Sequence, residues 1–287
     1  MRIEAGPLCS ALGVEHALEY PTRLAHGPDG RLYVSDVKVG SVFVQDGGAL
    51  VAELKGLGGP LGVAVDAAGR IYVGSRDRAA VEVYGPAGGL LHAIGAGAIG
   101  MPNDLALDAA GLLYVADSAA DAVRVYDTAS RALVRVLEGA GDGSPFHFPA
   151  AVAVTTELAA DGTATGELYV ADQGNGRIVV FDLEGRPLRQ LGERMEAFDA
   201  DWQGRFVRLQ SVATDGAGRV YAADSRLALV QVLDADGGYL GHYGRLGRAP
   251  GELYLPLDVE LAPDGALVVA NAENHRIERF VAPQGGE

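Results

Sequence analysis

The feature that most constrains this chain is a sequence pattern that recurs six times along it. Each copy has a short run of Val, Ala and Leu, usually after a Pro, then a turn containing Gly, then a second run that ends in Tyr-Val-Ala-Asp or a close variant. The copies begin near residues 20, 59, 101, 148, 209 and 255. Self-similarity at this spacing is typical of repeat architectures, so residues 1–287 are expected to form one domain.

Each copy predicts four antiparallel strands. Residues 114–117 show how the second strand ends, and residues 177–182 are a third strand rich in β-branched and aromatic residues. A shorter fourth strand follows, as in residues 239–244. Sheets of this kind, with apolar residues on both faces, must be covered by neighbouring sheets, so six copies predict an all-β, six-bladed β-propeller of four-stranded antiparallel blades.

Composition agrees with a turn-rich β fold. The chain has 287 residues, of which 41 are Gly and 13 are Pro, and 48% are hydrophobic. Turns are therefore dense, which argues against a helical bundle, while the apolar share is ordinary for a globular domain.

The amino-acid sequence of the repeat resembles that of the NHL family. Residues 60–66 read Pro-Leu-Gly-Val-Ala-Val-Asp, residues 169–172 read Tyr-Val-Ala-Asp, and residues 177–181 read Arg-Ile-Val-Val-Phe. The resemblance covers about Tyr20 to Phe280, and the first copy departs most from it. It implies a six-bladed propeller that acts as a non-enzymatic scaffold for binding a protein or a small ligand.

The last copy stops near Phe280, so its outer strand is missing from that end of the chain. Residues 5–13 resemble an outer strand such as residues 238–244. We therefore expect the N-terminal segment to close the ring as the outer strand of the last blade, which removes an exposed sheet edge.

Polar residues that break the repeat symmetry are candidates for a binding site at the mouth of the central channel. They occupy the first two positions after the Pro that opens most copies, or after Leu209 in the fifth copy. Asp104 should face Asp258 across the ring, and Arg23 could neutralise one of them or clamp an anionic ligand. A solvated, merely polar channel mouth is the alternative. The candidate ligand-binding residues are Arg23, Asn103, Asp104, Gln210, Ser211 and Asp258.

Enzyme signatures are weak in this sequence. Asn103 and Asp104 resemble one metal-ligand segment of gluconolactonase-type lactonases, but the other inner-strand starts do not supply the remaining ligands. The His positions do not form the cluster of a peptide-amidating lyase, and Cys9 is the single cysteine. No catalytic residue, metal or cofactor is predicted. The alternative reading is a lactonase-like or amidating-lyase-like hydrolase or lyase acting at the channel mouth.

Two long loops are candidates for contact with a partner, because loops on a rigid scaffold often carry function. Residues 139–148 add aromatic residues and a His, and residues 192–208 carry the only Trp and an acidic run. Exposed aromatics would supply binding energy and the carboxylates would steer a basic partner. The candidate partner-binding residues are Phe146, His147, Glu193, Glu196, Asp199, Asp201 and Trp202.

The acid at the end of the second strand recurs in most copies, as Asp36, Asp117, Asp172 and Asp224. A ring of catalytic carboxylates would have this appearance, but so would a repeated structural element. We expect each carboxylate to cap the following bend by accepting backbone N–H bonds.

The charge of the chain excludes some partners. It has 23 Lys and Arg against 38 Asp and Glu, a formal net charge of −15, which repels a phosphate backbone. Nucleic acid is not an expected partner, and no run is long and apolar enough for membrane insertion. We expect a soluble monomer that binds a protein, with a lean towards the periplasm or cell surface and an export signal absent from this chain.

Overall fold

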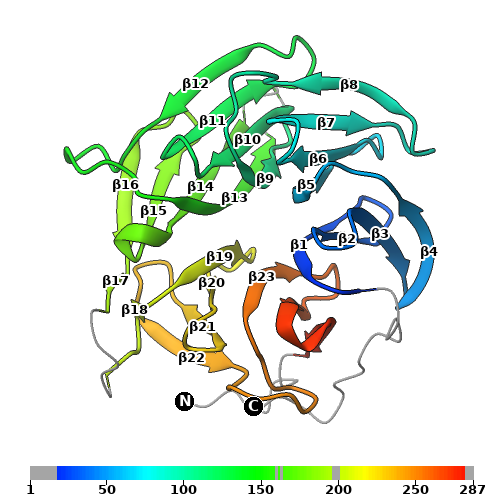
Figure 1. Ribbon diagram of the computed structural model, residues 1–287. Helices are drawn as coiled ribbons and strands as arrows, with labels where there is room; N and C mark the ends of the chain where they lie inside the picture. Colours follow the sequence, from blue (N-terminus) through cyan, green and yellow to red (C-terminus); the bar gives the residue numbers. More distant parts are fainter. Residues whose placement is uncertain (1–17, 159–160, 162–163, 196–200, 282–287) are drawn as a thin grey trace.

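The computed structural model describes residues 18–158, 161, 164–195 and 201–281. Its strands form six antiparallel sheets arranged as blades around a central axis (Figure 1). The expected β-propeller is confirmed. In each blade the strands follow chain order from the axis outward, and the innermost strands of the six blades surround the channel.

The first three blades have four strands each. Blade one contains β1 (Pro21–His26), β2 (Leu32–Asp36), β3 (Ser41–Asp46) and β4 (Ala49–Leu54). Blade two contains β5 (Pro60–Val65), β6 (Ile71–Ser75), β7 (Ala80–Tyr84) and β8 (Leu90–Ile94). Blade three contains β9 (Pro102–Leu107), β10 (Leu112–Asp117), β11 (Ala122–Asp127) and β12 (Leu133–Leu137).

The other three blades differ in strand length and number. Blade four contains β13 (Pro149–Leu158), β14 (Ala164–Asp172), β15 (Arg177–Asp182) and β16 (Pro187–Leu191). Blade five contains β19 (Leu209–Thr214), β20 (Val220–Asp224), β21 (Leu229–Leu233) and β22 (Tyr239–Tyr243). Blade six contains β23 (Pro256–Leu261), β24 (Leu267–Asn271) and β25 (Arg276–Phe280). The short pair β17 (Glu193–Arg194) and β18 (Arg205–Phe206) and the 3-10 turns η1 (Gln173–Asn175) and η2 (Ala272–Asn274) lie outside the blade sheets.

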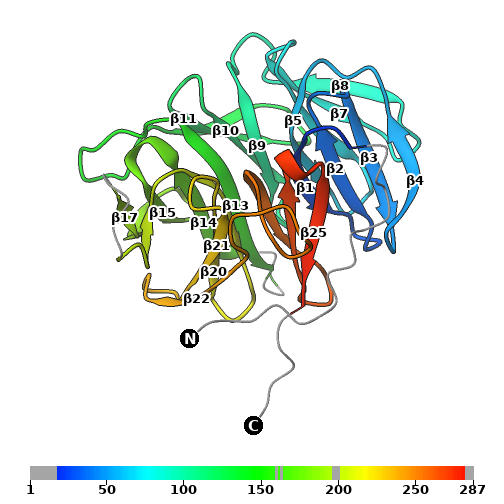
Figure 2. The same cartoon turned by 60° about the horizontal axis from the view of Figure 1, so that its bottom comes forward.

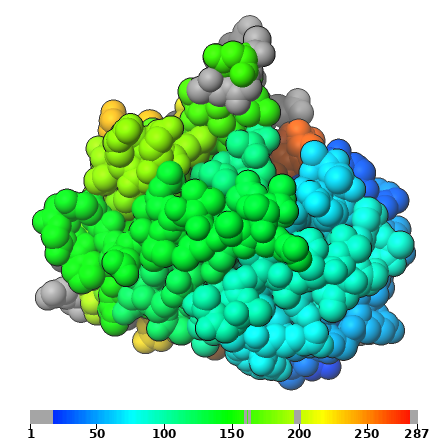
Figure 3. All heavy atoms as spheres, turned by 90° about the horizontal axis from the view of Figure 1, so that it is seen from above, coloured from blue at the N-terminus to red at the C-terminus, as the bar shows by residue number. Residues whose placement is uncertain are grey.

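The core consists of layers between neighbouring blades rather than one central cluster. Between blades three and four, Val123 and Leu137 pack with Phe181 of the next blade. Between blades five and six, the ring centroids of Tyr243 and Phe280 lie 5.5 Å apart. Each blade therefore has both faces covered, which explains why its strands are apolar on both sides. Blade four has the longest strands, and their hairpin end projects from the molecule (Figure 3).

Two of the four repeated acids, Asp36 and Asp224, cap the following bend as expected from the sequence. By contrast, Asp117 and Asp172 accept N–H bonds from the loop before the innermost strand and from a neighbouring Arg. Asp36 Oδ1 accepts backbone N–H bonds from the bend that follows it, including one of 3.0 Å from Val39. Its Oδ2 accepts N–H bonds of 2.7 and 2.8 Å from Glu19 and Tyr20, just before the innermost strand. Asp224 makes the equivalent bonds in blade five. This carboxylate therefore ties the bend to the loop that leads into β1.

Blade six has three strands in the part of the chain that the structure describes, with β25 outermost (Figure 2). The expected closing segment, residues 5–13, lies outside the described residues.

The face of the propeller at which the innermost strands begin is named the mouth face. The loops from each outer strand to the next innermost strand lie on it.

Candidate functional site

The central channel contains a cavity of about 270 Å³ lined by residues of all six innermost strands. Asp104, Ser211 and Asp258 line the end of this cavity nearest the mouth face. His26 and Glu260 line its far end, where His26 Nδ1 lies 3.8 Å from Glu260 Oε1. The channel thus has carboxylates at both ends and mostly small apolar side chains between them.

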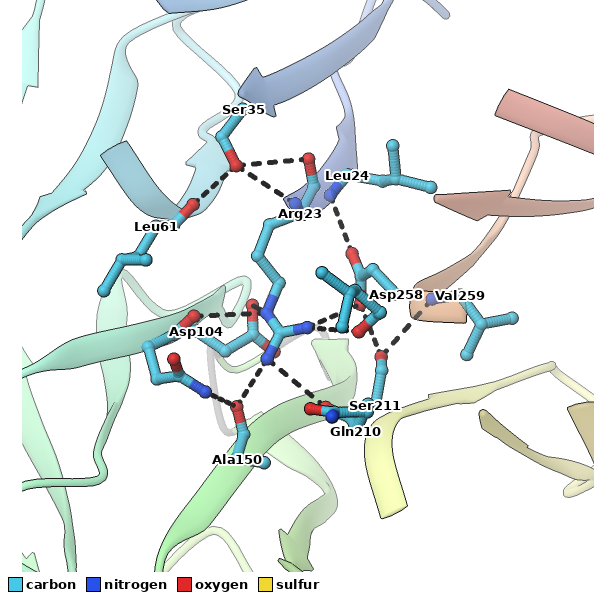
Figure 4. A network of polar contacts seen from close by, with 12 residues as sticks. Arg23, Leu24, Ser35, Leu61, Asp104, Ala150, Gln210, Ser211, Asp258 and Val259 are labelled. Atoms are coloured by element: carbon cyan, nitrogen blue, oxygen red, sulfur yellow. Dashed lines mark hydrogen bonds and ion pairs between the residues drawn. The ribbon is translucent and has the colours of Figure 1, made fainter. Parts of the chain in front are cut away.

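Arg23 lies across the channel mouth with only 2% of its surface exposed. Its guanidinium group donates hydrogen bonds to backbone carbonyls of four other blades (Figure 4). The acceptors are Asn103 O (3.1 Å), Ala150 O (2.7 Å), Gln210 O (3.3 Å) and Leu257 O. The planar fork of an Arg side chain suits such a ring of acceptors, and this single group joins blades one, three, four, five and six.

Two buried carboxylates flank the guanidinium group, as the sequence predicted. Asp104 Oδ1 lies 3.4 Å from Arg23 Nε, and Asp258 Oδ1 lies 3.8 Å from Arg23 Nη1. Asp258 also accepts bonds from the Ser211 hydroxyl and, at 2.7 Å, from the backbone N–H of Leu24. Both carboxylates are therefore held by the chain itself. Arg23, Asp104, Ser211 and Asp258 together are named the Arg23 cluster.

Burial dominates the ionisation of the two carboxyl groups. It raises the pKa of Asp104 and of Asp258 well above the ordinary value, although the Arg23 guanidinium opposes this by favouring the charged forms. Asp104 raises the pKa of Asp258 further, because two carboxylates share one cation. The geometry therefore favours a proton on one carboxyl group of the cluster at neutral pH.

Ser35 connects blade two to the same site, and sequence reasoning missed it. Its hydroxyl donates a 2.6 Å hydrogen bond to Leu61 O and accepts one of 3.0 Å from Arg23 N–H. A signal was present, because Ser35 occupies the position that is Ala in Tyr114-Val115-Ala116-Asp117 and in three other copies. A polar residue in place of a small apolar one at a buried strand position indicates a specific partner.

The remaining two candidates, Asn103 and Gln210, contribute side chains as well as carbonyls. Asn103 Nδ2 donates a 2.7 Å hydrogen bond to Ala150 O. Gln210 Nε2 donates a 3.0 Å bond to Ser225 Oγ, and its Oε1 accepts a 3.1 Å bond from Gln173 Nε2. The structure thus brings all six predicted mouth residues together, and their contacts are with one another or with neighbouring blades.

The loop candidates are more dispersed, and one expectation is wrong. Phe146 is not exposed: it is 2% exposed and packs edge-to-face on Phe181, with ring centroids 6.1 Å apart. It occupies the third position before the innermost strand, where each blade inserts a buried apolar residue. The neighbouring His147 is exposed instead, and so is Phe148, at 38%.

One predicted carboxylate of the second loop is paired with a cation of the same loop. Glu193 is paired with Arg205, whose Nε lies 2.9 Å from Glu193 Oε1. Asp201 is exposed, whereas Glu196 and Asp199 lie outside the described residues. Trp202 is half-buried against the rings of Tyr239 and His242, with centroids 5.6 and 5.1 Å away. Trp202 therefore anchors the loop to the outer strand β22.

Other exposed aromatics lie at the starts of the innermost strands. Tyr254 is 39% exposed, and the guanidinium carbon of Arg248 lies 4.7 Å from its ring centroid. Burial and the Glu273 carboxylate raise the pKa of Tyr20, and the Arg208 guanidinium opposes this rise. Apart from Tyr20, these residues lie, like Phe148, in the loops that lead into the innermost strands of blades four to six, on the mouth face. Phe148, Tyr254, Arg248 and Arg208 together are named the mouth rim.

The described residues contain no group of three or more His, Cys, Asp and Glu that could hold a metal ion. None of the described helices is long and apolar enough to cross a membrane.

Comparison with known proteins places the fold but not a family. No protein-family model matches the chain, and no curated protein matches it. Hydrazine synthase of Kuenenia stuttgartiensis is similar in structure, with a TM-score of 0.64 and 18% identity over 95% of this chain and 98% of that one. A streptogramin B lyase structure has a TM-score of 0.63 and 12% identity over 93% of this chain and 94% of that one. At these identities the likeness defines the chain as a six-bladed β-propeller.

Proposed function

We propose that this protein is a non-enzymatic, NHL-like binding scaffold that presents its mouth face to a protein partner. The observation that carries the proposal is the saturation of the channel mouth. Arg23 binds both carboxylates and the carbonyls of other blades, and Asp104 and Asp258 also accept backbone N–H bonds, so the polar groups of the cluster already have partners within the fold.

The alternative, a hydrolase or lyase acting at the mouth, draws support from the lyase and synthase names of the structural neighbours. The geometry supports it less. A general acid or base must reach the proton that it transfers, but Asp104 and Asp258 are 7% and 4% exposed. A raised carboxyl pKa is typical of catalytic acids, yet here burial beside a second carboxyl group explains it.

The mouth rim supports binding of a protein rather than of a small ligand. Arg23 lies across the mouth, and the side chains of the rim are exposed to solvent. Tyr and Arg, two of the three residue types most enriched at binding hot spots, are both in the rim. The negative net charge of the chain would speed the approach of a basic partner, while Arg208 and Arg248 would bind its carboxylates or carbonyls.

The test is a capture experiment with variants of matched surface chemistry. The immobilised protein is incubated with an extract of its native host, and retained proteins are quantified by mass spectrometry. Phe148→Ala/Tyr254→Ala is expected to lose a partner that the wild-type protein retains.

The matched control is Leu91→Ala/Leu188→Ala, which removes apolar groups that are 56% and 50% exposed on the outer strands β8 and β16. The control should retain the same partner. If the two variants retain the same proteins, the mouth face is not the binding surface. If the wild-type protein converts a substrate and Asp258→Asn abolishes that activity, the enzyme alternative replaces this proposal.

A further inference from the structure

Two residues at the far end of the channel break the repeat. Glu260 is paired with Val268, whereas the equivalent residue of every other innermost strand is an Ala that is paired with the Tyr of the second strand. His26 stands one position further along its own innermost strand, where the other blades have Val, Leu or Thr. The fold of a blade does not require a carboxylate or an imidazole at these positions, so their presence indicates a specific role.

The two side chains lie close together without a hydrogen bond between them. His26 Nδ1 lies 3.8 Å from Glu260 Oε1, which is too long for a hydrogen bond. This nitrogen is shielded from solvent and has no hydrogen-bond partner among the described residues. A buried polar atom without a partner is costly. An ammonium group between the two atoms can donate to both of them at ordinary hydrogen-bond lengths, because it carries three donors.

The channel has more carboxylates than cations. Asp104, Asp258 and Glu260 line it, and no Lys or Arg is among the described residues of its lining. Arg23 lies beside Asp104 and Asp258 at the mouth end, whereas Glu260 is at the other end. Burial is the main reason why the pKa of Asp104 is raised, and the Glu260 carboxylate raises it further. The charge of Glu260 therefore acts within the channel, where it stabilises a cation.

The walls of the channel also offer acceptors to a cation. Each innermost strand pairs with its sheet on one side only, so the N–H and C=O groups of its other edge are not used by the sheet. At the mouth end, carbonyls of four such strands accept hydrogen bonds from the guanidinium group of Arg23. The chain thus places its own cation at one end of the channel and a carboxylate with an imidazole at the other.

The far end is the accessible end. The side chain of Glu260 is 35% exposed, whereas Arg23 at the mouth is 2% exposed. The loops from the innermost to the second strands lie on this face, and each of the six carries one Asp while only three carry an Arg and none a Lys. This excess of negative charge attracts cations to the face. The six residues are Asp29, Asp66, Asp108, Asp161, Asp215 and Asp264.

We infer that the far end of the channel binds a small organic cation, whose ammonium group lies between Glu260 and His26 and whose body lies in the channel. The cavity of about 270 Å³ is larger than a single metal ion needs. Glu260 and His26 are also fewer protein ligands than such an ion usually has. The site is separate from the mouth face, so its test does not depend on the proposed protein partner.

The probe is 1,4-diaminobutane. Asp258 and Glu260 are two positions apart on β23, so their side chains leave the same side of the strand about 7 Å apart. The diamine carries one charge at each end of a chain of similar length. Isothermal titration calorimetry of the full chain, near neutral pH and with EDTA present, should show one binding site. 1,4-Butanediol, which has the same chain without the charges, should not bind.

Three variants test the role of Glu260. Glu260→Gln keeps the shape of the side chain but removes its charge, and it should weaken binding by at least about tenfold. The matched control, Glu184→Gln, removes a carboxylate from a turn on the same face, where the side chain is 59% exposed, and should change the Kd less than twofold. Glu260→Ala introduces the residue of the other five copies, so it should fold and also lose binding.

Side-chain NMR locates the bound diamine. Among the described His residues only His26 lines the channel, so its ring resonances, assigned by their loss in His26→Asn, should shift most during the titration. The absence of diamine binding, equal weakening by Glu184→Gln and Glu260→Gln, or shifts at other His residues but not at His26 would overturn the inference. Binding that occurs only without EDTA would also overturn it, because the ligand would then be a metal ion.

Discussion

The Arg23 cluster and the mouth rim lie on the same face of the propeller but differ in burial and in how their polar or aromatic groups are bound. The polar groups of the cluster are buried and bound to groups of the chain itself, whereas the aromatic rings of the rim are partly exposed to solvent. Removing one member of a buried ion pair leaves a charge without a partner and destabilises the fold, whereas exposed aromatics are enriched at binding hot spots. Polarity at a channel mouth is therefore not by itself a sign of catalysis.

The largest expected effect is the loss of Arg23. Arg23→Ala removes the only cation of the cluster, so two buried carboxyl groups lose their counter-charge and four carbonyls lose a donor. Breaking a buried ion pair in this way typically costs about 3–5 kcal/mol of unfolding free energy. Urea denaturation measures it. Arg23→Lys keeps the charge but not the planar fork, so its loss should be intermediate. If Arg23→Ala lowers the unfolding free energy by less than about 1 kcal/mol, the cluster does not stabilise the fold more than the rim does, and the account is wrong.

The next effect separates two neighbouring aromatic residues. Phe146→Ala leaves a cavity between blades three and four and should lower the unfolding free energy by about 3–5 kcal/mol. Phe148→Ala, two residues away and 38% exposed, should change it by less than about 1 kcal/mol. Thermal and urea denaturation of the two variants provide the comparison. Equal losses would show that Phe148 belongs to the core and not to the rim.

A smaller effect concerns pH. Burial raises the pKa of Asp258 and Asp104 in the folded state, so the folded protein holds protons that the unfolded chain releases. The contribution of these groups is then fully present below their ordinary pKa near 4 and is lost as the pH rises through the folded-state values. Unfolding free energy should therefore decrease from about pH 5 to pH 8, and the slope should be shallower in Asp258→Asn. An unchanged slope in this variant would exclude Asp258 as its source.

Much of the architecture could be predicted from the sequence because the same strand and turn signals occur in most of the six copies. The Pro that opens most copies, the Tyr-Val-Ala-Asp endings and the Gly turns located the strands, and the capping role of Asp36 followed from its recurrence. The charged members of the Arg23 cluster were also predicted, because they break the repeat. Backbone acceptors such as Ala150 O were not predictable, since every residue has a carbonyl.

The prediction that failed concerned Phe146. Phe146 and Phe148 both precede an innermost strand, and composition alone does not show which of the two points into the seam. The register decides this: the buried apolar residue stands three positions before the strand, as Ile99 does before Pro102. Comparing Leu18, Leu57 and Leu253 across the copies could have revealed this rule, because all three are apolar at the same offset.

The central claim is that the Arg23 cluster holds the blades together through direct interaction of its members. A double-mutant cycle of Arg23→Ala and Asp258→Asn, measured by urea denaturation at one pH near neutrality, tests this most directly. Once Arg23 is absent, Asp258 is a buried carboxyl group without its cation, so replacing it should cost little or restore stability. The account predicts that the double variant loses less unfolding free energy than the sum of the two single variants, by at least about 1 kcal/mol. Additive losses would contradict it.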